Sequence, residues 1–215
     1  MGVSSRLESV EVLLETPDYL VLNKPCRKHF DEVLTQSVNK GVWVPAHRLD
    51  FETSGCLLFC RPEKLASFRA YFQSRPPELE KLYLAGASRR VDELENRESL
   101  EATGFIGGRY RSSKKVRFAT EATELKGYHG VQAVSHRVSR AQAARPDAWE
   151  GEVYRVRLFS GARHQIRAWF AAQGAPLVGD PVYGDAGERL ELHAERLAWI
   201  DPESRRPYEA TAPVR

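Results

Sequence analysis

One stretch of the chain, residues 152–174, changes its hydrophobic period from two to nearly four without an interruption. In EVYRVRL the apolar side chains fall on every second residue, which predicts a strand with one buried face. In the following ARHQIRAWFAAQG, residues Ile166, Trp169 and Phe170 recur at helical spacing, and Gly174 supplies a C-terminal stop. Strands and helices do not alternate strictly elsewhere, so we expect an α+β fold rather than a doubly wound parallel sheet.

The polar residues of this predicted helix share a stripe opposite its apolar face. Arg163, His164 and Arg167 fall about one turn apart on that stripe. An arginine in such a position is usually a solvated helix charge. A histidine there, like His193 further along the chain, is more often a structural hydrogen-bonding group than a catalyst.

Apolar runs bounded by glycine and proline predict the other elements. Pro62 suits the first turn of a helix that Pro76 and Pro77 would stop. Residues 138–151 are predicted to form a surface excursion. We predict strands in DYLVLNK, GCLLFC and KLYLAGA and a last strand in LELHAERLAWI, at residues 18–24, 55–60, 81–87 and 190–200.

The whole chain has the composition of an ordinary globular protein. Its 215 residues suit one large domain, and 42% hydrophobic residues supply a normal core. No apolar run approaches the roughly 20 residues that span a bilayer, and the N-terminus lacks the pattern of a signal peptide. Three cysteines, Cys26, Cys56 and Cys60, cannot form a full disulfide set, and the last two lie in an apolar run. We therefore expect a cytoplasmic protein that does not insert into membranes.

The net charge of +3 is only mildly basic, but the basic residues are unevenly distributed. The segment GGRYRSSKKVRF, residues 107–118, holds five basic residues, no acidic residue and two aromatic rings. A flexible basic arm of this kind is suited to following phosphates, whereas the alternative is a solvated hairpin loop. The basic residues are Arg109, Arg111, Lys114, Lys115 and Arg117.

The stretch PAHRLDFETSG, residues 45–55, places an Asp directly after a His and an Arg. Two interpretations are open: a surface ion pair, or an ionised Asp50 in a site that handles an anionic substrate. The cysteines and histidines show no CxxC or HExxH spacing, and no Walker, dinucleotide or GxSxG motif is present. The sequence therefore predicts a cofactor-independent enzyme, or no enzyme.

Five motifs in a fixed order carry a resemblance to a known family. HRLDFETSG resembles the signature of the RluA-type pseudouridine synthases, which reads HRLD, two variable residues and TSG. The resemblance spans roughly residues 18–213. The other four motifs are NKP, EKLYLA, HQIRAWFAAQGAPLVGDPVYG and LHAERLAWIDP.

The resemblance implies the fold of that family, a mixed and mainly antiparallel sheet flanked by helices and loops with a catalytic cleft. It implies that residues 18–215 are a single catalytic domain, that residues 1–17 are an extension or edge strand, and that no separate N-terminal RNA-binding domain is present. It further implies a monomer with no cofactor, no metal and no obligate protein partner. The implied activity is isomerisation of uridines in tRNA or rRNA stem-loops to pseudouridine.

The resemblance also implies roles for individual residues. Asp50 would be the essential aspartate, either attacking the sugar or removing a sugar proton to give a glycal. Tyr83 would stack on the target base and assist proton handling, and Arg167 would pair with Asp50. Arg48 would fill the place of the flipped nucleotide. Arg163, His164 and the five basic residues of the 107–118 segment would contact RNA.

Two departures from the family pattern stand out. The chain reads Gly161-Ala162-Arg163 where relatives have an Arg directly after the glycine, and the NKP segment lacks its usual following glycine. Two other functions remain as alternatives: a non-catalytic RNA-binding or RNA-folding protein on the same scaffold, and an RNA hydrolase with Asp50 as a base. The hydrolase would want a metal cluster or a His pair, which the sequence does not offer.

Overall fold

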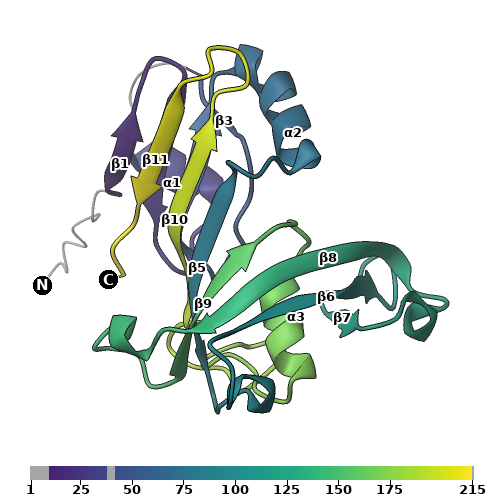
Figure 1. Ribbon diagram of the computed structural model, residues 1–215. Coiled ribbons are helices and arrows are strands. Elements are labelled where there is room, and N and C mark those ends of the chain that lie inside the picture. The colour runs from purple at the N-terminus through teal and green to yellow at the C-terminus, as the bar shows by residue number, and fades with distance from the viewer. Residues whose placement is uncertain (1–9, 38–41, 215) are drawn as a thin grey trace, which may run out of the picture.

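The strands and helices of the computed structural model, which describes residues 10–37 and 42–214, form an α+β fold around one sheet (Figure 1). The strand order is β1-β2-β4-β10-β5-β9-β8-β6-β7, with β11 paired to β10 and β3 paired to β4. Every described pair is antiparallel except β4 with β10, which is parallel. The sheet is therefore mixed and mainly antiparallel, as predicted.

The bounds of the elements agree closely with the predicted runs. The strands are β1 Val12–Glu15, β2 Tyr19–Lys24, β3 Val44–Pro45, β4 Ser54–Cys60, β5 Glu80–Ala87, β6 Ser99–Gly108, β7 Val116–Ala119, β8 His129–Arg140, β9 Glu152–Leu158, β10 Leu192–Ile200 and β11 Pro207–Thr211. The α-helices are α1 Phe30–Ser37, α2 Leu65–Ser74 and α3 Gln165–Ala172, and short 3₁₀ turns cover Pro62–Lys64, Asp92–Leu94, Ala122–Leu125 and Gln142–Ala144.

Two predictions about the ends of elements were wrong. The strand β10 is not the last, because β11 folds back antiparallel on it and stacks Tyr208 on Trp199 with ring centroids 5.4 Å apart. Residues 138–151 are not wholly a surface excursion, because β8 continues to Arg140 and Trp149 is 1% exposed. Trp149 packs in a small cluster with Leu84 and Val153.

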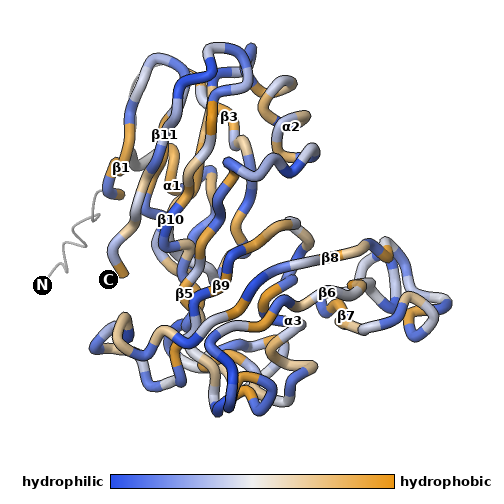
Figure 2. The backbone as a smooth tube through the Cα atoms, viewed as in Figure 1, coloured by the Kyte–Doolittle hydropathy of each residue, from blue (hydrophilic) through white to orange (hydrophobic). Residues whose placement is uncertain are grey.

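The central strands are buried on both faces. Along β2, Tyr19 and Val21 join one core cluster, whereas Leu20 and Leu22 join the other. The residues of β4 divide between the same two clusters. Burial raises the pKa of the Cys56 thiol on this strand to about 12, so this cysteine is an inert core residue, as expected. In Figure 2 hydrophobic segments follow the strands and the outer loops are mostly hydrophilic.

The parallel contact between β4 and β10 depends on the glycine of the TSG motif. Gly55 has φ +106°, and a Cβ atom there would clash with the backbone of Ala194. Next to it, the Ser54 hydroxyl lies 2.9 Å from Nδ1 of His193, whose Nε2 lies 3.0 Å from the Ala212 carbonyl. His193 is therefore a structural histidine that ties β4 to β10, as expected.

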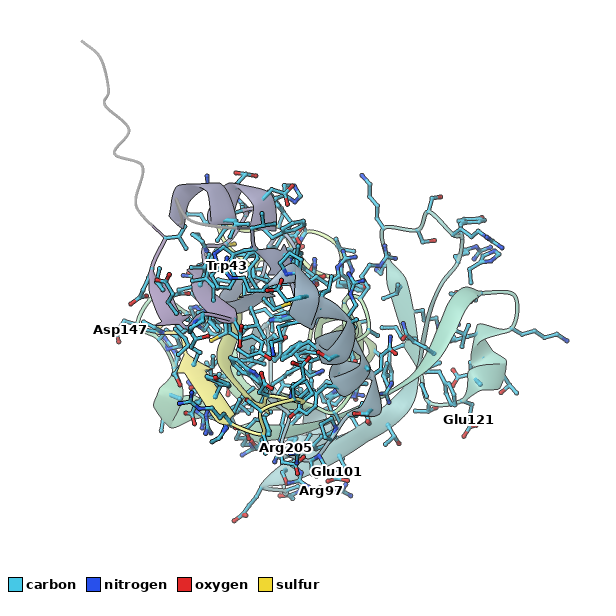
Figure 3. All side chains as sticks on the ribbon, turned by 90° about the horizontal axis from the view of Figure 1, so that it is seen from above. Trp43, Arg97, Glu101, Glu121, Asp147 and Arg205 are labelled. Carbon is cyan, nitrogen blue, oxygen red and sulfur yellow. The ribbon has the colours of Figure 1, made fainter. Side chains whose placement is uncertain are left out.

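Strands β6, β7 and β8 form an extension to one side of the sheet. Seen from above, side chains crowd between the sheet and helices α1 and α2, whereas the extension that carries Glu121 stands apart from them (Figure 3). The basic segment 107–118 is the turn of the β6–β7 hairpin at this extension. No helix among the described residues is long and apolar enough to cross a membrane.

Two histidine rings make the stability of the fold sensitive to acid. Nε2 of His47 accepts a hydrogen bond from the Leu58 amide at 3.1 Å, and His136 is fully buried against Trp169. Burial lowers the pKa of both rings to about 4, and the charge of Lys81 adds to this effect at His47. Between pH 6.5 and 4 the unfolded chain binds protons that the folded chain excludes, so stability is lost as pH falls through this window.

We expect the free energy of unfolding to fall by about 2 kcal/mol for each ring between about pH 7 and pH 5, which is roughly 4 kcal/mol for the two together. Urea denaturation at a series of pH values measures the change. The variant His136→Gln removes one of the two rings, so its stability should depend less steeply on pH. An unchanged slope in this variant would show that His136 does not cause the effect.

Candidate active site

The turn that carries Asp50 is fixed from beneath by a buried lysine. Asp50 lies in the turn before β4, and its carbonyl accepts a hydrogen bond from the Thr53 amide at 3.1 Å. Lys24, 2% exposed at the end of β2, donates to the Phe51 carbonyl at 3.0 Å and to two carbonyls of the 25–28 loop. Burial lowers the pKa of Lys24 to about 8. The NKP motif thus positions the Asp50 turn.

The 25–28 loop reaches its shape without the glycine that the family pattern has. Arg27 takes the left-handed conformation with φ 56°, where a glycine would meet no steric penalty. Its guanidinium donates to the Gly187 carbonyl at 2.6 Å, and the Cys26 thiol donates to the Glu52 carbonyl at 2.9 Å. Side-chain contacts therefore hold this loop against the Asp50 turn.

Arg167 is the centre of a buried ion-pair network. Its side chain, fully buried on α3, makes two hydrogen bonds with the Asp180 carboxylate at 2.7 and 2.8 Å. On its other side Nη1 lies 3.1 Å from Glu52 and 3.4 Å from Asp50. Burial by itself would lower the pKa of Arg167, but these carboxylates outweigh it and hold the guanidinium charged. The ordinary alternative for this arginine, a solvated helix charge, therefore does not apply.

Asp180 supplies the countercharge that keeps Arg167 in place. It is 0% exposed, and its Oδ1 also accepts hydrogen bonds from the amides of Val182 and Tyr183 at 2.9 and 3.2 Å. Burial would raise the pKa of this carboxyl, but the Arg167 guanidinium and the two amides lower it below the ordinary value. A charged Asp180 thus orients Arg167 toward the Asp50 turn.

Tyr83 and Asp50 line the same small cavity. Tyr83 lies in the middle of β5, opposite Ala194 of β10 and Val156 of β9. The cavity has a volume of about 60 Å³, room for only a few water molecules. Burial and the nearby charge of Asp50 raise the pKa of Tyr83 well above its usual range, so the phenol is neutral. Among the described residues the Tyr83 hydroxyl has no hydrogen-bond partner.

His164 also faces Asp50, from a backbone conformation outside the helix. It has φ 55°, and α3 begins only at the next residue, Gln165. Its Nε2 lies 3.9 Å from Asp50 and its Nδ1 lies 3.3 Å from the Tyr183 hydroxyl. Burial lowers the pKa of His164, partly offset by Asp50. Arg163 and His164 therefore do not share a helical stripe with Arg167, contrary to the prediction.

Gln165 fixes the turn between β9 and α3, which contains Ala162. Its buried Oε1 accepts hydrogen bonds from the Ala162 amide at 3.1 Å and from the Ser160 hydroxyl at 2.8 Å. These bonds fix the turn without help from side chain 162. The adjacent Arg163 is exposed and donates to the carbonyl of Ser113 in the basic hairpin.

Tyr183 connects the basic hairpin to the cavity. Its hydroxyl accepts from the Val116 amide at 2.9 Å and donates to the Val116 carbonyl at 3.0 Å. Lys115 lies over the Tyr183 ring at 5.1 Å, and the Arg167 guanidinium lies 5.7 Å from the same ring. Of the two interpretations of this segment, a flexible arm and a hairpin loop, the structure shows the hairpin, and Tyr183 fastens it beside the cavity.

The structure brings most of the predicted site residues together. The cavity is lined by Arg48, Asp50, Tyr83, His164 and Arg167. The hairpin residues Arg109, Arg111, Lys114, Lys115 and Arg117 are exposed outside it, and Arg117 forms an ion pair with Glu124 at 3.3 Å.

Sequence reasoning missed three members of this site, namely Glu52, Asp180 and Tyr183. The motif GDPVYG was noted only as a turn, and an acid thirteen residues beyond Arg167 has no local spacing that connects the two. The only feature of the sequence that could have indicated these residues is that Asp180 and Tyr183 lie together in a short turn bounded by glycine and proline.

This arrangement can hold an ionised carboxylate next to a neutral phenol in a partly buried cavity. Such a pair suits an attack on, or a proton transfer from, a neutral ring and its sugar. Among the described residues, no three His, Cys, Asp or Glu side chains gather as potential metal ligands.

Comparisons with known proteins agree on one family. The chain matches the family described as RNA pseudouridylate synthase over residues 16–172. It is 27% identical to the RNA pseudouridylate synthase domain-containing protein 1 of Danio rerio, over 96% of this chain and 75% of that protein. It is also 27% identical to the dual-specificity RNA pseudouridine synthase RluA of Pasteurella multocida, over 86% of this chain and 84% of that protein.

A comparison of folds gives the same result. The solved structure of human RNA pseudouridylate synthase domain containing 1 superposes with a TM-score of 0.76 at 21% identity. The superposition covers 96% of this chain and 84% of the human chain. The fold predicted from the motifs is therefore confirmed.

Proposed function

The chain belongs to the RNA pseudouridylate synthase family and is an RluA-type isomerase, and we propose that it acts on specific uridines of structured RNA with Asp50 as its essential carboxylate. The observation that carries the proposal is the contact of Asp50 with Arg167 at 3.4 Å, at the edge of the cavity that Tyr83 lines. This contact orients the Asp50 carboxylate toward the cavity. An ionised carboxylate is the form that both candidate routes need.

The reaction moves one bond and one proton and needs no redox step. The bond between ribose C1′ and uracil N1 breaks, the uracil turns, and a bond forms between C1′ and C5. The proton of C5 leaves, and N1 takes one up. Asp50 either attacks C1′ or removes the proton at C2′ to give a glycal, and both routes return the carboxylate at the end.

The small size of the cavity supports base flipping with help from Arg48. A volume of about 60 Å³ does not hold a nucleoside, so a target uridine enters only if the cavity widens. Arg48 is exposed and lines the cavity, which makes it the side chain with most freedom to move. It then fills the gap that the uridine leaves in the RNA stack.

The substrate is a tRNA or rRNA stem-loop, bound through the basic hairpin together with Arg163 and His164. The hairpin is fastened to Tyr183 through Val116 and Lys115, and Tyr183 in turn lies against His164 at the cavity, so a phosphate backbone leading to the target would run along the hairpin. The Pasteurella relative is named for dual specificity, which supports more than one RNA target here. We propose residues 18–215 as one catalytic domain that works as a cytoplasmic monomer without a cofactor.

Incubation of the protein with unmodified tRNA and rRNA pools, kept separate, tests this function. Nucleosides from each digested pool are separated by chromatography, and pseudouridine is expected in at least one of them. The pool in which it appears identifies the RNA class. If RNA is bound but no pseudouridine forms in either pool, the proposed substrates are wrong.

The variant Tyr83→Phe separates the two roles proposed for that ring. Phenylalanine keeps the stacking face and removes the hydroxyl, so we expect the rate constant of isomerisation to fall by about 10²–10⁴-fold while RNA affinity changes little. Since the hydroxyl has no hydrogen-bond partner among the described residues, the thermal midpoint should remain within a few degrees. Single-turnover kinetics and filter binding measure both quantities. A variant as fast as the wild type would exclude proton handling by Tyr83.

A further inference from the structure

A second and larger cavity lies on the other side of the Asp50 turn. It has a volume of about 480 Å³ and is bordered by residues of α1, α2, β3 and the 48–51 turn. Arg48 and Leu49 line both cavities, so the turn forms a wall between them. We call it the aromatic pocket, and its defining residues are Lys28, His29, Phe30, Arg48, Phe51 and Arg69.

The aromatic pocket exposes large rings that the core does not use. Phe51 is 40% exposed and Phe30 is 42% exposed, whereas the other phenylalanines of this chain are buried or half-buried. The rings of His29 and Phe51 lie against each other with centroids 4.7 Å apart. Exposed aromatic faces gathered at one concave place are typical of a binding surface rather than of packing.

The charges of the pocket suit an anionic ligand. Lys28, Arg48 and Arg69 line it, and no acidic side chain does. Lys28 is 3.6 Å from Glu32, whereas Arg48 and Arg69 form no ion pair among the described residues. A flat aromatic face beside two arginines that form no ion pair within the described part of the chain fits a nucleotide, which offers a ring to stack and a phosphate to pair.

The pocket is also held at a fixed place relative to Asp50. Phe51 follows Asp50 directly in the chain, so their Cα atoms are about 3.8 Å apart. Lys24 donates to the carbonyls of Phe51 and Lys28 at 3.0 and 2.9 Å, which joins the two sides of the pocket. The aromatic faces therefore keep their position when a ligand occupies the neighbouring cavity.

We propose that the aromatic pocket binds the nucleotide adjacent to the target uridine, with its base stacked on Phe51 and its phosphate on Arg69. This inference rests on the proposed function, because it takes the neighbouring cavity as the uridine site. Arg48 stands between the two bases, so the RNA is splayed around the 48–51 turn. Recognition then depends on an unpaired neighbour, which selects loops and bulges over duplex RNA.

The test uses a single-stranded RNA probe of about nine nucleotides with a central uridine and the fluorescent base 2-aminopurine beside it. Binding is measured with an Asp50→Asn protein so that no turnover occurs. In that background, Phe51→Leu keeps an apolar side chain and removes the stacking face. Val12→Ala, which trims an exposed apolar residue of the β1 edge strand, is the matched control.

We expect Phe51→Leu to bind roughly 5- to 150-fold more weakly than the control, the range for loss of one base–aromatic stack. It should also lose the quenching of 2-aminopurine that stacking causes. Arg69→Gln should instead make the slope of the logarithm of the binding constant against the logarithm of salt concentration shallower, by the amount that corresponds to about one phosphate contact. Equal affinity and equal quenching in Phe51→Leu and the control would overturn the inference.

The wild-type protein, with Asp50 intact, is assayed in parallel for pseudouridine in tRNA and rRNA. Absence of pseudouridine there counts against the proposed function, whatever the probe shows. If an otherwise wild-type Phe51→Leu protein forms pseudouridine normally and probe binding is unchanged, the inference about the aromatic pocket is wrong while the proposed function stands.

Discussion

The variant Asp50→Asn is expected to abolish pseudouridine formation while RNA binding persists. Asparagine has the same shape but can neither attack C1′ nor accept a proton, so the loss should be at least about 10⁴-fold, the scale for removal of an essential nucleophile or base. Single-turnover assays with excess enzyme measure the rate, and filter binding measures affinity within the same preparation.

The charge balance around Asp50 makes this substitution mild for the fold. Arg167 keeps Asp180 and Glu52 as partners when Asp50 becomes neutral. The thermal midpoint should therefore change by no more than a few degrees. If RNA binding disappeared together with activity in a folded variant, Asp50 would be a binding residue and the catalytic assignment would be wrong.

Loss of Arg167 is expected to have the largest effect on stability. In Arg167→Met the buried carboxylate of Asp180 loses its countercharge, and breaking a buried pair in this way costs about 3–5 kcal/mol. For a chain of this length, that corresponds to a fall of roughly 6–20 °C in the thermal midpoint. Activity should be lost as well, because the contact that orients Asp50 is then absent.

A double variant separates these two consequences. Asp180→Asn removes the stranded charge but leaves an oxygen for the amides of Val182 and Tyr183. We expect Arg167→Met/Asp180→Asn to be more stable than Arg167→Met alone and yet equally inactive. Recovery of activity along with stability would reduce Arg167 to a structural residue. Thermal denaturation and the single-turnover assay are run on all three variants.

The local pattern of the chain was sufficient to predict the elements that carry the site. The change of period across residues 152–174 marked β9 and α3, and the NKP and HRLDFETSG motifs marked the loops that meet beside them. The weaker strand β11 was missed because PYEAT has only two apolar residues facing the core beside its proline.

The buried charges could not be predicted from local pattern. Helical spacing placed Arg167 on the polar stripe, and only the long-range approach of Asp180 and Glu52 makes its burial possible. Likewise, nothing local indicated that Tyr183 fastens the hairpin through Val116, or that Phe51 and His29 meet beside Asp50. These contacts join residues between 22 and 115 positions apart, apart from the closer pair Arg167 and Asp180.

The most direct test of the account is tritium release from RNA labelled at C5 of uracil, because that proton leaves only when the new C–C bond forms. Wild type and Asp50→Asn are assayed side by side on total unmodified tRNA and rRNA. The account predicts release by the wild type and none by the variant. Release by both proteins would contradict the role of Asp50, and release by neither would contradict isomerase activity on these RNAs.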